Sequence, residues 1–415
     1  MPSHGDPPAP ESAAGRWLRF LGLQRSTVGV LAMVVLVGMG ERMSERFLPI
    51  YLIALGGGAL SIGLLNALDH LLSALYSYLG GYLSDRLGTR RSLVLFNLVA
   101  MAGFLIVILF PFWQAVIAGA VLFISWSSVS LPATMGLIVR VLPAGKRIMG
   151  ASMYSLVNRI PMALGPILGG FCIAAWGERD GVRVAFGVAL ALALAGLVLQ
   201  QAMIVEPRSK PATGRPVSSP RALWRRMRPA LRNLLVADIL VRFCEQITGA
   251  FVVVWCMKVI ARPVSAVEFG LLTSIEMATA VLIYIPVAWL ADRGGKKPFV
   301  LTTFVMFTAF PLALMVAPSF EWMVPVFVLR GLKEFGEPTR KALIVELAPD
   351  DQKAAMFGMY YLVRDSVVAV AALGGALLWE VGPRVNFTAA FACGVLGTVY
   401  YALRGSDDQP GPTRG

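Results

Sequence analysis

Two stretches of this chain are copies of one pattern: residues 63–91, GLLNALDHLLSALYSYLGGYLSDRLGTRR, and residues 270–298, GLLTSIEMATAVLIYIPVAWLADRGGKKP. They align without gaps at an offset of 207 residues, and eight of the 29 positions are identical. Each copy is an apolar stretch that leads into an Asp-Arg pair followed by a glycine. Internal similarity at a fixed offset indicates a duplicated structural unit.

A second stretch repeats at almost the same offset, 206 residues. It aligns Pro132 with Pro338 and the pair Met153-Tyr154 with Met359-Tyr360. Two independent stretches at nearly one offset are more than shared hydrophobicity explains. The sequence therefore predicts two similar halves joined by a connector.

The composition places both halves in a membrane. Of the 415 residues, 57% are hydrophobic and only 15% are charged, whereas soluble domains carry about 25% charged residues. Apolar runs of about 20 residues cross a bilayer as helices, because unpaired backbone polar groups cannot face lipid. The sequence thus predicts an all-α membrane protein with twelve spans in two pseudo-symmetric six-helix bundles. The expected spans are 27–55, 60–83, 92–111, 115–140, 148–176, 183–205, 233–258, 266–290, 298–317, 321–346, 353–379 and 385–403.

The same pattern divides the chain into five parts. We expect a disordered, basic N-terminal segment at 1–26, bundles at 27–205 and 233–404, a connector at 206–232, and a tail at 405–415. The Arg-rich connector suits an amphipathic helix lying on anionic lipid, and a plain basic linker is the equally open alternative.

The net charge of +13 is distributed unevenly across the predicted loops. One set of loops, together with both termini, carries most of the Lys and Arg residues. The opposite set holds Arg179, Arg183, Lys258, Arg262 and Arg384. By the positive-inside rule, both termini are expected to be cytoplasmic in a multi-pass protein of a bacterial inner membrane. This bias accounts for the charge without a nucleic-acid partner.

The loop after the second predicted span carries a family motif. It reads Gly81-Tyr-Leu-Ser-Asp85-Arg86-Leu-Gly88-Thr-Arg90-Arg91. This resembles the signature loop G-x-x-x-D-R-x-G-x-R-R of the major facilitator superfamily, whose two six-helix halves transport solutes by alternating access. The second copy, AWLADRGGKK at 288–297, has alanine in place of the first glycine. It keeps Asp292, Arg293, Gly295 and Lys297.

The resemblance implies that these two loops form a cytoplasmic gating latch. An Asp can meet the positive end of a facing helix and nearby Arg side chains, and Gly88 permits the tight turn. The alternative is a basic turn that only sets orientation. The duplicated Asp-Arg pair favours the latch, because it adds nothing to the positive-inside bias.

A second motif lies in the fifth predicted span: Gly165, Pro166, Gly169 and Gly170 in the run GPILGG. It resembles the GPxxGG motif of proton-coupled antiporters in the same family, and the corresponding second-half stretch at 371–375 lacks the Gly-Pro pair. A proline kink among glycines allows close helix contact. The motif favours efflux, and ordinary small-residue packing is the alternative.

Sixteen charged residues fall inside predicted spans. Each one facing lipid would cost about 2.5–3.5 kcal/mol or more, so we expect them to line a shared watery cavity and to neutralise one another in part. They are Glu41, Arg42, Glu45, Arg46, Asp69, Arg159, Asp238, Arg242, Glu245, Glu276, Arg330, Lys333, Glu334, Glu337, Arg364 and Asp365. The resemblance implies that spans one, four, seven and ten line this cavity, and the fourth contributes Trp126.

These charges divide into expected roles. About half should be interhelical salt bridges. A buried carboxylate away from a base can load and release a proton near neutral pH. The candidates for this role are Glu41, Glu45, Asp69 and Glu276, and His70 could assist Asp69. The candidates to hold a carboxylate or phosphate on the solute are Arg42, Arg46, Arg242, Arg330 and Lys333.

The functional hypothesis is a monomeric secondary transporter for a small-molecule solute, most readily a proton-coupled exporter of a polar or amphiphilic organic compound. A proton-coupled importer of an organic anion is the alternative within the same fold. A membrane-embedded enzyme or a sensor is disfavoured, because no catalytic constellation, metal-ligand spacing, phosphate loop or soluble output domain is apparent in the sequence. No metal or other cofactor is expected.

Overall fold

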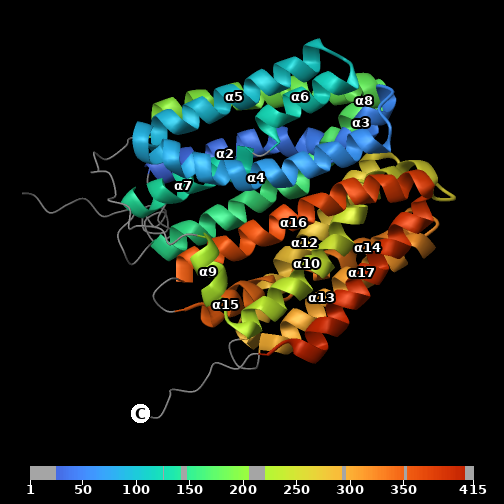
Figure 1. Cartoon of the computed structure of the whole chain (residues 1–415). Helices are drawn as coiled ribbons and strands as arrows, with labels where there is room; N and C mark the ends of the chain where they lie inside the picture. The colour runs from blue at the N-terminus through green and yellow to red at the C-terminus, as the bar shows by residue number, and fades with distance from the viewer. Residues whose placement is uncertain are drawn as a thin grey trace, which may run out of the picture.

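The computed structural model describes residues 25–124, 126–141, 147–204, 220–291, 296–349 and 353–406, and every regular element in them is helical (Figure 1). The first half contains α2 (Arg25–Glu45), α3 (Leu48–Ala54), α4 (Ala59–Leu87), α5 (Thr89–Leu109), α6 (Trp113–Phe123), α7 (Trp126–Val141) and α8 (Arg147–Met203). The connector contains α9 (Pro220–Arg226). The second half contains α10 (Pro229–Gly249), α11 (Val252–Val254), the π-helical turn η2 (Trp255–Val259), α12 (Ala266–Ala291), α13 (Lys296–Val316), α14 (Phe320–Leu332), α15 (Glu337–Leu347), α16 (Lys353–Val381) and α17 (Pro383–Arg404).

The helices form two bundles, with the first half on one side of the molecule and the second half on the other (Figure 1). Eight helices in the described residues are long and apolar enough to cross a membrane, and a ninth arises if α10 is joined to the bent segment that follows it. The longest helix, α8, bends at Gly177 (φ 77°) and so provides two spans. The remaining two predicted spans correspond to α4 and to α14 with α15. The predicted all-α architecture is therefore confirmed.

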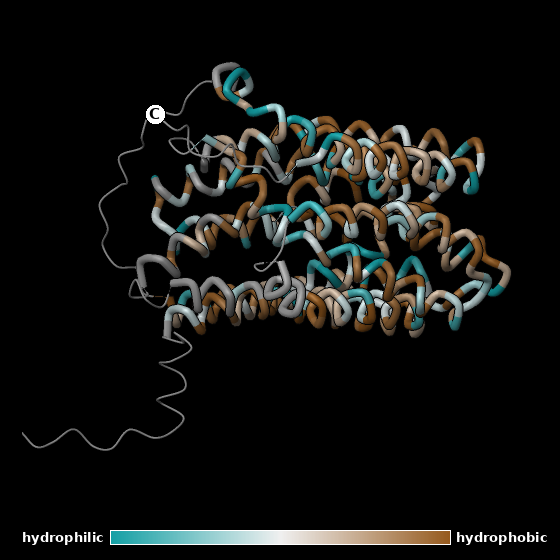
Figure 2. The backbone as a smooth tube through the Cα atoms, turned by 90° about the horizontal axis from the view of Figure 1, so that it is seen from below, coloured by the Kyte–Doolittle hydropathy of each residue, from teal (hydrophilic) through white to brown (hydrophobic). Residues whose placement is uncertain are grey.

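The hydropathy of the chain follows this arrangement. Hydrophobic residues run along most of the length of the helices, and hydrophilic residues gather at the ends and at some inner positions (Figure 2). Large apolar side chains such as Leu282, Val370 and Leu396 are exposed on the outer surface. Such a surface suits lipid rather than water.

Three spans that the sequence predicts to be continuous are interrupted. Breaks separate α2 from α3, α10 from α11, and α14 from α15. At the second break the segments bend by 42°. These are the first, seventh and tenth spans, three of the four expected to line the cavity. Non-helical backbone at membrane depth is tolerated where it is buried in protein or lines a watery cavity.

The two halves pack through α4 against α16 and through α8 against α12. Glycines allow the close approach: a Cβ added to Gly170 would lie 2.5 Å from the carbonyl oxygen of Ala266, and one added to Gly63 would lie 2.5 Å from the Cβ of Ala376. Both contacts lie toward the end of the molecule that carries the Gly177 bend, called here the Gly177 end. The opposite end, where α2 begins and α17 ends, is called the termini end.

The connector helix α9 is attached to the second half. Leu223 and Met227 are buried in the apolar cluster of that half. The guanidinium of Arg232 in α10 donates a hydrogen bond to the carbonyl oxygen of Trp224 at 3.0 Å, and it lies 5.6 Å from the centre of the Trp224 ring. The predicted connector also includes 206–219, which lie outside the described residues.

Candidate functional site

A cavity of about 230 Å³ lies between the two halves, beside the helix breaks. Part of its lining is apolar. The polar and charged residues that line it are Glu45, Arg46, Asn66, Asp69, His70, Glu245, Gln246, Arg330 and Lys333. They come from α2 to α4 in the first half and from α10 and α14 in the second, so the cavity belongs to both bundles. The structure thus brings together charged residues that the sequence placed on separate spans.

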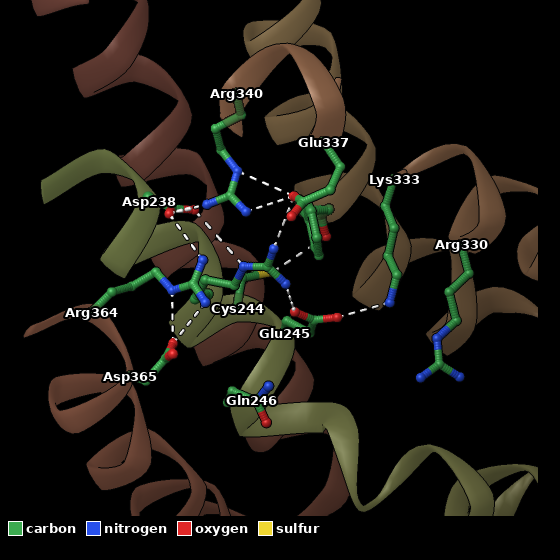
Figure 3. Close-up of polar contacts among 12 residues, drawn as sticks. Asp238, Cys244, Glu245, Gln246, Arg330, Lys333, Glu337, Arg340, Arg364 and Asp365 are labelled. Atoms are coloured by element: carbon green, nitrogen blue, oxygen red, sulfur yellow. Dashed lines mark hydrogen bonds and ion pairs between the residues drawn. The ribbon is translucent and has the colours of Figure 1, made fainter. Parts of the chain in front are cut away.

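The second half contributes a continuous network of ion pairs (Figure 3). Asp238, Arg242 and Glu245 occupy one face of α10. The Arg242 guanidinium donates to Glu245 at 2.6 Å and to Glu337 at 3.3 Å. The ammonium of Lys333 donates to the other oxygen of Glu245 at 2.8 Å. Most of these charges are therefore neutralised by a neighbour.

Asp238 anchors the deeper part of this network. It accepts hydrogen bonds from Arg340, from the Tyr360 hydroxyl at 2.9 Å and from Arg364 at 3.5 Å. Arg364 also pairs with Asp365 at 2.8 Å. The sequence analysis missed Arg340 and Tyr360. Arg340 lies three residues after Glu337, on the same helical face, and this spacing could have revealed it.

Glu276 of α12 faces two bases. It lies 3.3 Å from the Arg330 guanidinium and 3.6 Å from the Lys333 ammonium. The Arg330 guanidinium also lies 5.1 Å from the centre of the Phe310 ring. Glu276 is 1% exposed, and its position suits a structural ion-pair partner better than the proton-coupling role expected for it. That role stays a prediction.

The first half is more sparsely paired. Arg42 donates to Glu45 at 2.7 Å, one helical turn away. Glu41 is 2% exposed and accepts a hydrogen bond from the Ser127 hydroxyl at 2.7 Å. In the described part of the chain, no ion pair joins Glu41 to a basic side chain. A buried carboxylate whose only partner is a hydroxyl is costly in its charged form.

Arg46 lies in the turn between α2 and α3 and lines the cavity. It makes no hydrogen bond or ion pair with any residue that the structure describes. Asp69 and His70 of α4 also line the cavity. Beside them, the Asn66 amide donates to the Gln246 side-chain oxygen at 3.3 Å and so connects the two halves.

Two other predicted residues lie away from this cavity. Trp126 is buried inside the first half, where its indole donates to Asn97 at 2.8 Å. Glu334 lies 3.9 Å from Arg159 of α8, which makes a second polar connection between the halves. No pattern in the sequence pointed to either partner.

The GPILGG motif of α8 lies between α2 and α12. An added Cβ at Gly165 would lie 2.6 Å from the Cβ of Arg42, and one at Gly169 would lie 2.0 Å from the carbonyl oxygen of Met43. On the other side, a Cβ at Gly270 would meet the carbonyl oxygen of Pro166 at 2.6 Å, and Gly170 approaches Ala266 as described above. The motif thus contacts the helix segment that follows Glu41 and also the opposite half.

The predicted gating loop is described only in part. Gly88 has φ 83° and joins α4 to α5, as its place in the motif predicts. Arg90 donates to the side chain and the carbonyl oxygen of Gln201 in α8, Arg91 is exposed, and Arg86 lies over the Tyr82 ring. Gly81 lies within α4, and Lys297 lies in the first turn of α13. The Asp85 side chain and the second-copy residues Asp292, Arg293 and Gly295 lie outside what the structure describes.

Comparison with known proteins identifies the family. The Major Facilitator Superfamily model matches residues 30–261 and 234–414. The magnetosome protein MamH of Paramagnetospirillum magneticum is 25% identical, over 81% of this chain and 83% of MamH. An uncharacterised MFS-type transporter of Methanocaldococcus jannaschii is 22% identical, over 84% of this chain and 87% of that protein. A crystal structure of the nucleoside transporter NupG shares the fold with a TM-score of 0.77 at 13% identity, covering 92% of this chain and all of that one. The chain is a member of the Major Facilitator Superfamily, and it is a membrane transporter.

Proposed function

We propose that this transporter couples the movement of protons to the export of a polar or amphiphilic organic compound, with Glu41 as the proton carrier. In this proposal the chain works as a monomer in a bacterial inner membrane, with both termini in the cytoplasm. The cavity between the halves is exposed to one side of the membrane at a time. The two copies of the gating loop act as a latch at the cytoplasmic face.

The environment of Glu41 carries the proposal. Its carboxylate is buried at membrane depth, and among the described residues its one hydrogen-bond partner is the Ser127 hydroxyl. The neighbouring Arg42 attracts it without direct contact, so its charged form receives less compensation than Glu245 and Glu276 receive from the bases that they contact. Binding a proton removes that cost, and access to water during transport allows the proton to leave. Among the four acids expected to carry protons, Glu45 is paired with Arg42, and Glu276 faces two bases. Asp69 is half-buried and lines the open cavity, so burial opposes its charge less than that of Glu41. Glu41 therefore fits the role best.

The position of Glu41 also suits coupling. The next two residues, Arg42 and Met43, contact Gly165 and Gly169 of α8. The same stretch of α8 packs on α12 of the opposite half. Two helix contacts, α2 with α8 and α8 with α12, thus connect Glu41 to the interface between the halves, which must open during transport. This placement of an antiporter-like motif beside the proton carrier supports export.

Import of an organic anion together with a proton is the second candidate. The observation that favours it is Arg46, a cavity guanidinium without a partner among the described residues. Whether solute and protons move in opposite directions or together is a separate question from which residue carries the proton. One assay addresses the two questions.

The test uses purified transporter in proteoliposomes that contain a pH indicator, with equal pH on both sides. Small organic acids, amines and neutral amphiphiles are added outside, and protein-free liposomes correct for passive permeation. Antiport makes the lumen alkaline, because each entering solute expels a proton, whereas symport makes it acidic. We expect alkalinisation for the solute that is transported.

The variant Glu41→Gln should abolish the pH change while labelled solute still exchanges across the membrane. Glu380→Gln, a matched change at an exposed position at the end of α16, should behave as wild type. Solute-driven pH changes that persist unchanged in Glu41→Gln would refute the assignment of Glu41. Acidification by the wild type would favour the importer.

A further inference from the structure

We infer that the transported solute is a small amphiphilic anion whose carboxylate or phosphate group binds Arg46, and whose apolar part lies against the wall formed by α3, α11 and Phe269. This inference rests on the proposed function, because it assigns the substrate class of the same cavity. It adds which of the five candidate bases contacts the solute and what the rest of the solute must be.

The first observation is that the candidate bases are not equivalent. Lys333 is held by Glu245 and Glu276, and Arg330 faces Glu276. Arg42 and Arg242 are held by carboxylates within hydrogen-bond distance and do not line this cavity. Of the five, Arg46 is the one that lines the cavity without a hydrogen bond or ion pair to a described residue. A half-buried guanidinium without a partner favours an anionic ligand, and its planar fork suits carboxylate and phosphate oxygens.

The second observation is the local environment of Arg46. The nearby bases Arg330 and Lys333 share carboxylate partners, so their charges are largely cancelled at a distance. Arg46 makes no such direct pair, and Glu276 and Glu45 attract it only from beyond ion-pair distance. The positive potential in the cavity should therefore be highest at the break between α2 and α3. A solute anion bound there would also lie near the second half, because Arg330 and Lys333 line the same cavity.

The third observation is the apolar wall that adjoins Arg46. Leu48 follows Arg46 by two residues, and Val252 and Val253 of α11 together with Phe269 of α12 line the same cavity. Phe47 and Phe269 form an edge-to-face ring contact at 5.9 Å that connects the halves beside this wall. Binding sites typically combine such apolar surfaces with a few polar groups that fix orientation. The arrangement favours one anionic group on an otherwise apolar solute over a highly polar solute.

The test does not require the natural solute. The variant Ala250→Cys introduces a thiol at a half-buried cavity position, and this thiol reports the potential through its reaction with methanethiosulfonate reagents of similar size and opposite charge. The ratio of the rates for the anionic and the cationic reagent is measured in full-length protein, with unsubstituted protein correcting for Cys172 and Cys393. We expect the anionic reagent to react faster, and Arg46→Gln to lower the ratio by about tenfold or more.

Arg46→Lys keeps the charge and should retain most of the ratio, which separates loss of charge from misfolding. Arg384→Gln removes an exposed charge at the Gly177 end and should leave the ratio unchanged. Benzoate and phenyl phosphate should protect the introduced thiol from labelling when Arg46 is intact, whereas benzylamine and benzyl alcohol should protect it much less. The difference between benzoate and phenyl phosphate identifies which anionic group is preferred.

Several outcomes would overturn the inference. These are a faster reaction of the cationic reagent, a ratio that is insensitive to Arg46→Gln, the absence of reaction with either reagent, or equal protection by the amine and the anions. None of these measurements depends on proton coupling. In Glu41→Gln, a rate ratio equal to that of the wild type supports this inference, whether or not proton coupling is lost. The two proposals can therefore fail separately.

Discussion

Arg340 illustrates at the scale of single residues how buried charges are held in this protein. Its side chain is 1% exposed and contacts two carboxylates, those of Asp238 and Glu337. Removing one partner of a buried pair leaves an uncompensated charge, and this typically costs about 3–5 kcal/mol. The network therefore makes the second half sensitive to single substitutions.

We expect Arg340→Met to lower the free energy of unfolding by about 3–5 kcal/mol, because Asp238 and Glu337 lose a shared partner. The neighbouring variant Lys341→Met removes a half-exposed base that lies 3.4 Å from Glu337, and it should cost at most about 1 kcal/mol. Thermal unfolding of both variants in the same detergent measures the difference. Equal losses in the two variants would show that burial does not set the cost.

Sequence reasoning at this scale found which residues are unusual but not their partners. Glu41 and Arg46 stood out because charges are rare in spans. Their contrasting environments depend on which side chains of other helices come near, and no local pattern encodes that. Arg340 was missed for a different reason: it lies near the predicted end of a span, where a basic residue is ordinary.

At the scale of helices, close packing by glycine fixes how α8 lies against α2. The carbonyl oxygen of Met43 occupies the space that a side chain at Gly169 would need. The obstacle is backbone, so it cannot move without shifting a helix. The same segment of α2 carries Glu41, and the exact separation of these helices should therefore matter for transport as well as for stability.

We expect Gly169→Ala to destabilise the protein by about 1–3 kcal/mol, because the added methyl group pushes α2 away from α8. Gly187→Ala, in the same helix, places its methyl group in open space and should be neutral or stabilising by up to about 1 kcal/mol. Melting temperatures of the two variants give the comparison. An unchanged melting temperature for Gly169→Ala would contradict the packing described here.

The sequence predicted the spans well and their interruptions poorly. Length and hydropathy locate a segment that crosses the membrane, because the lipid imposes both. The breaks after Glu45 and Leu332 have a local cause that length and hydropathy do not reveal. Pro49 and Pro338 are the second residues of α3 and α15, where a proline removes a backbone N–H and clashes with the carbonyl group four residues earlier. Gly249 and Gly336 mark two of the breaks, but many other glycines of this chain lie inside unbroken helices.

At the scale of the whole molecule, the halves are held together at the Gly177 end. The close approach of Gly170 to Ala266 and of Gly63 to Ala376 brings helices of the two halves together. Lys258 of η2 forms an ion pair with Glu178 of α8 at the same end. The alternating access proposed above requires these contacts to separate, so their strength should set the balance between the two conformations.

We expect Glu178→Lys to shift this balance toward a state open at the Gly177 end, because it replaces an attraction with a repulsion. The pair is partly exposed, so the expected change is about 1 kcal/mol, or roughly fivefold in population. The measurement is the distance between spin labels at Gly58 and Arg262, on opposite halves. The exchange of both charges, Glu178→Lys with Lys258→Glu, should restore the original distribution, and a failure to do so would argue against the ion pair.

The attachment of α9 to the second half has a consequence for regulation at the termini end of the molecule. Since Leu223 and Met227 are buried in that half, α9 must travel with it as one body. A protein or lipid that bound α9 would therefore restrain the whole second half of the transporter, and it would do so without entering the solute pathway.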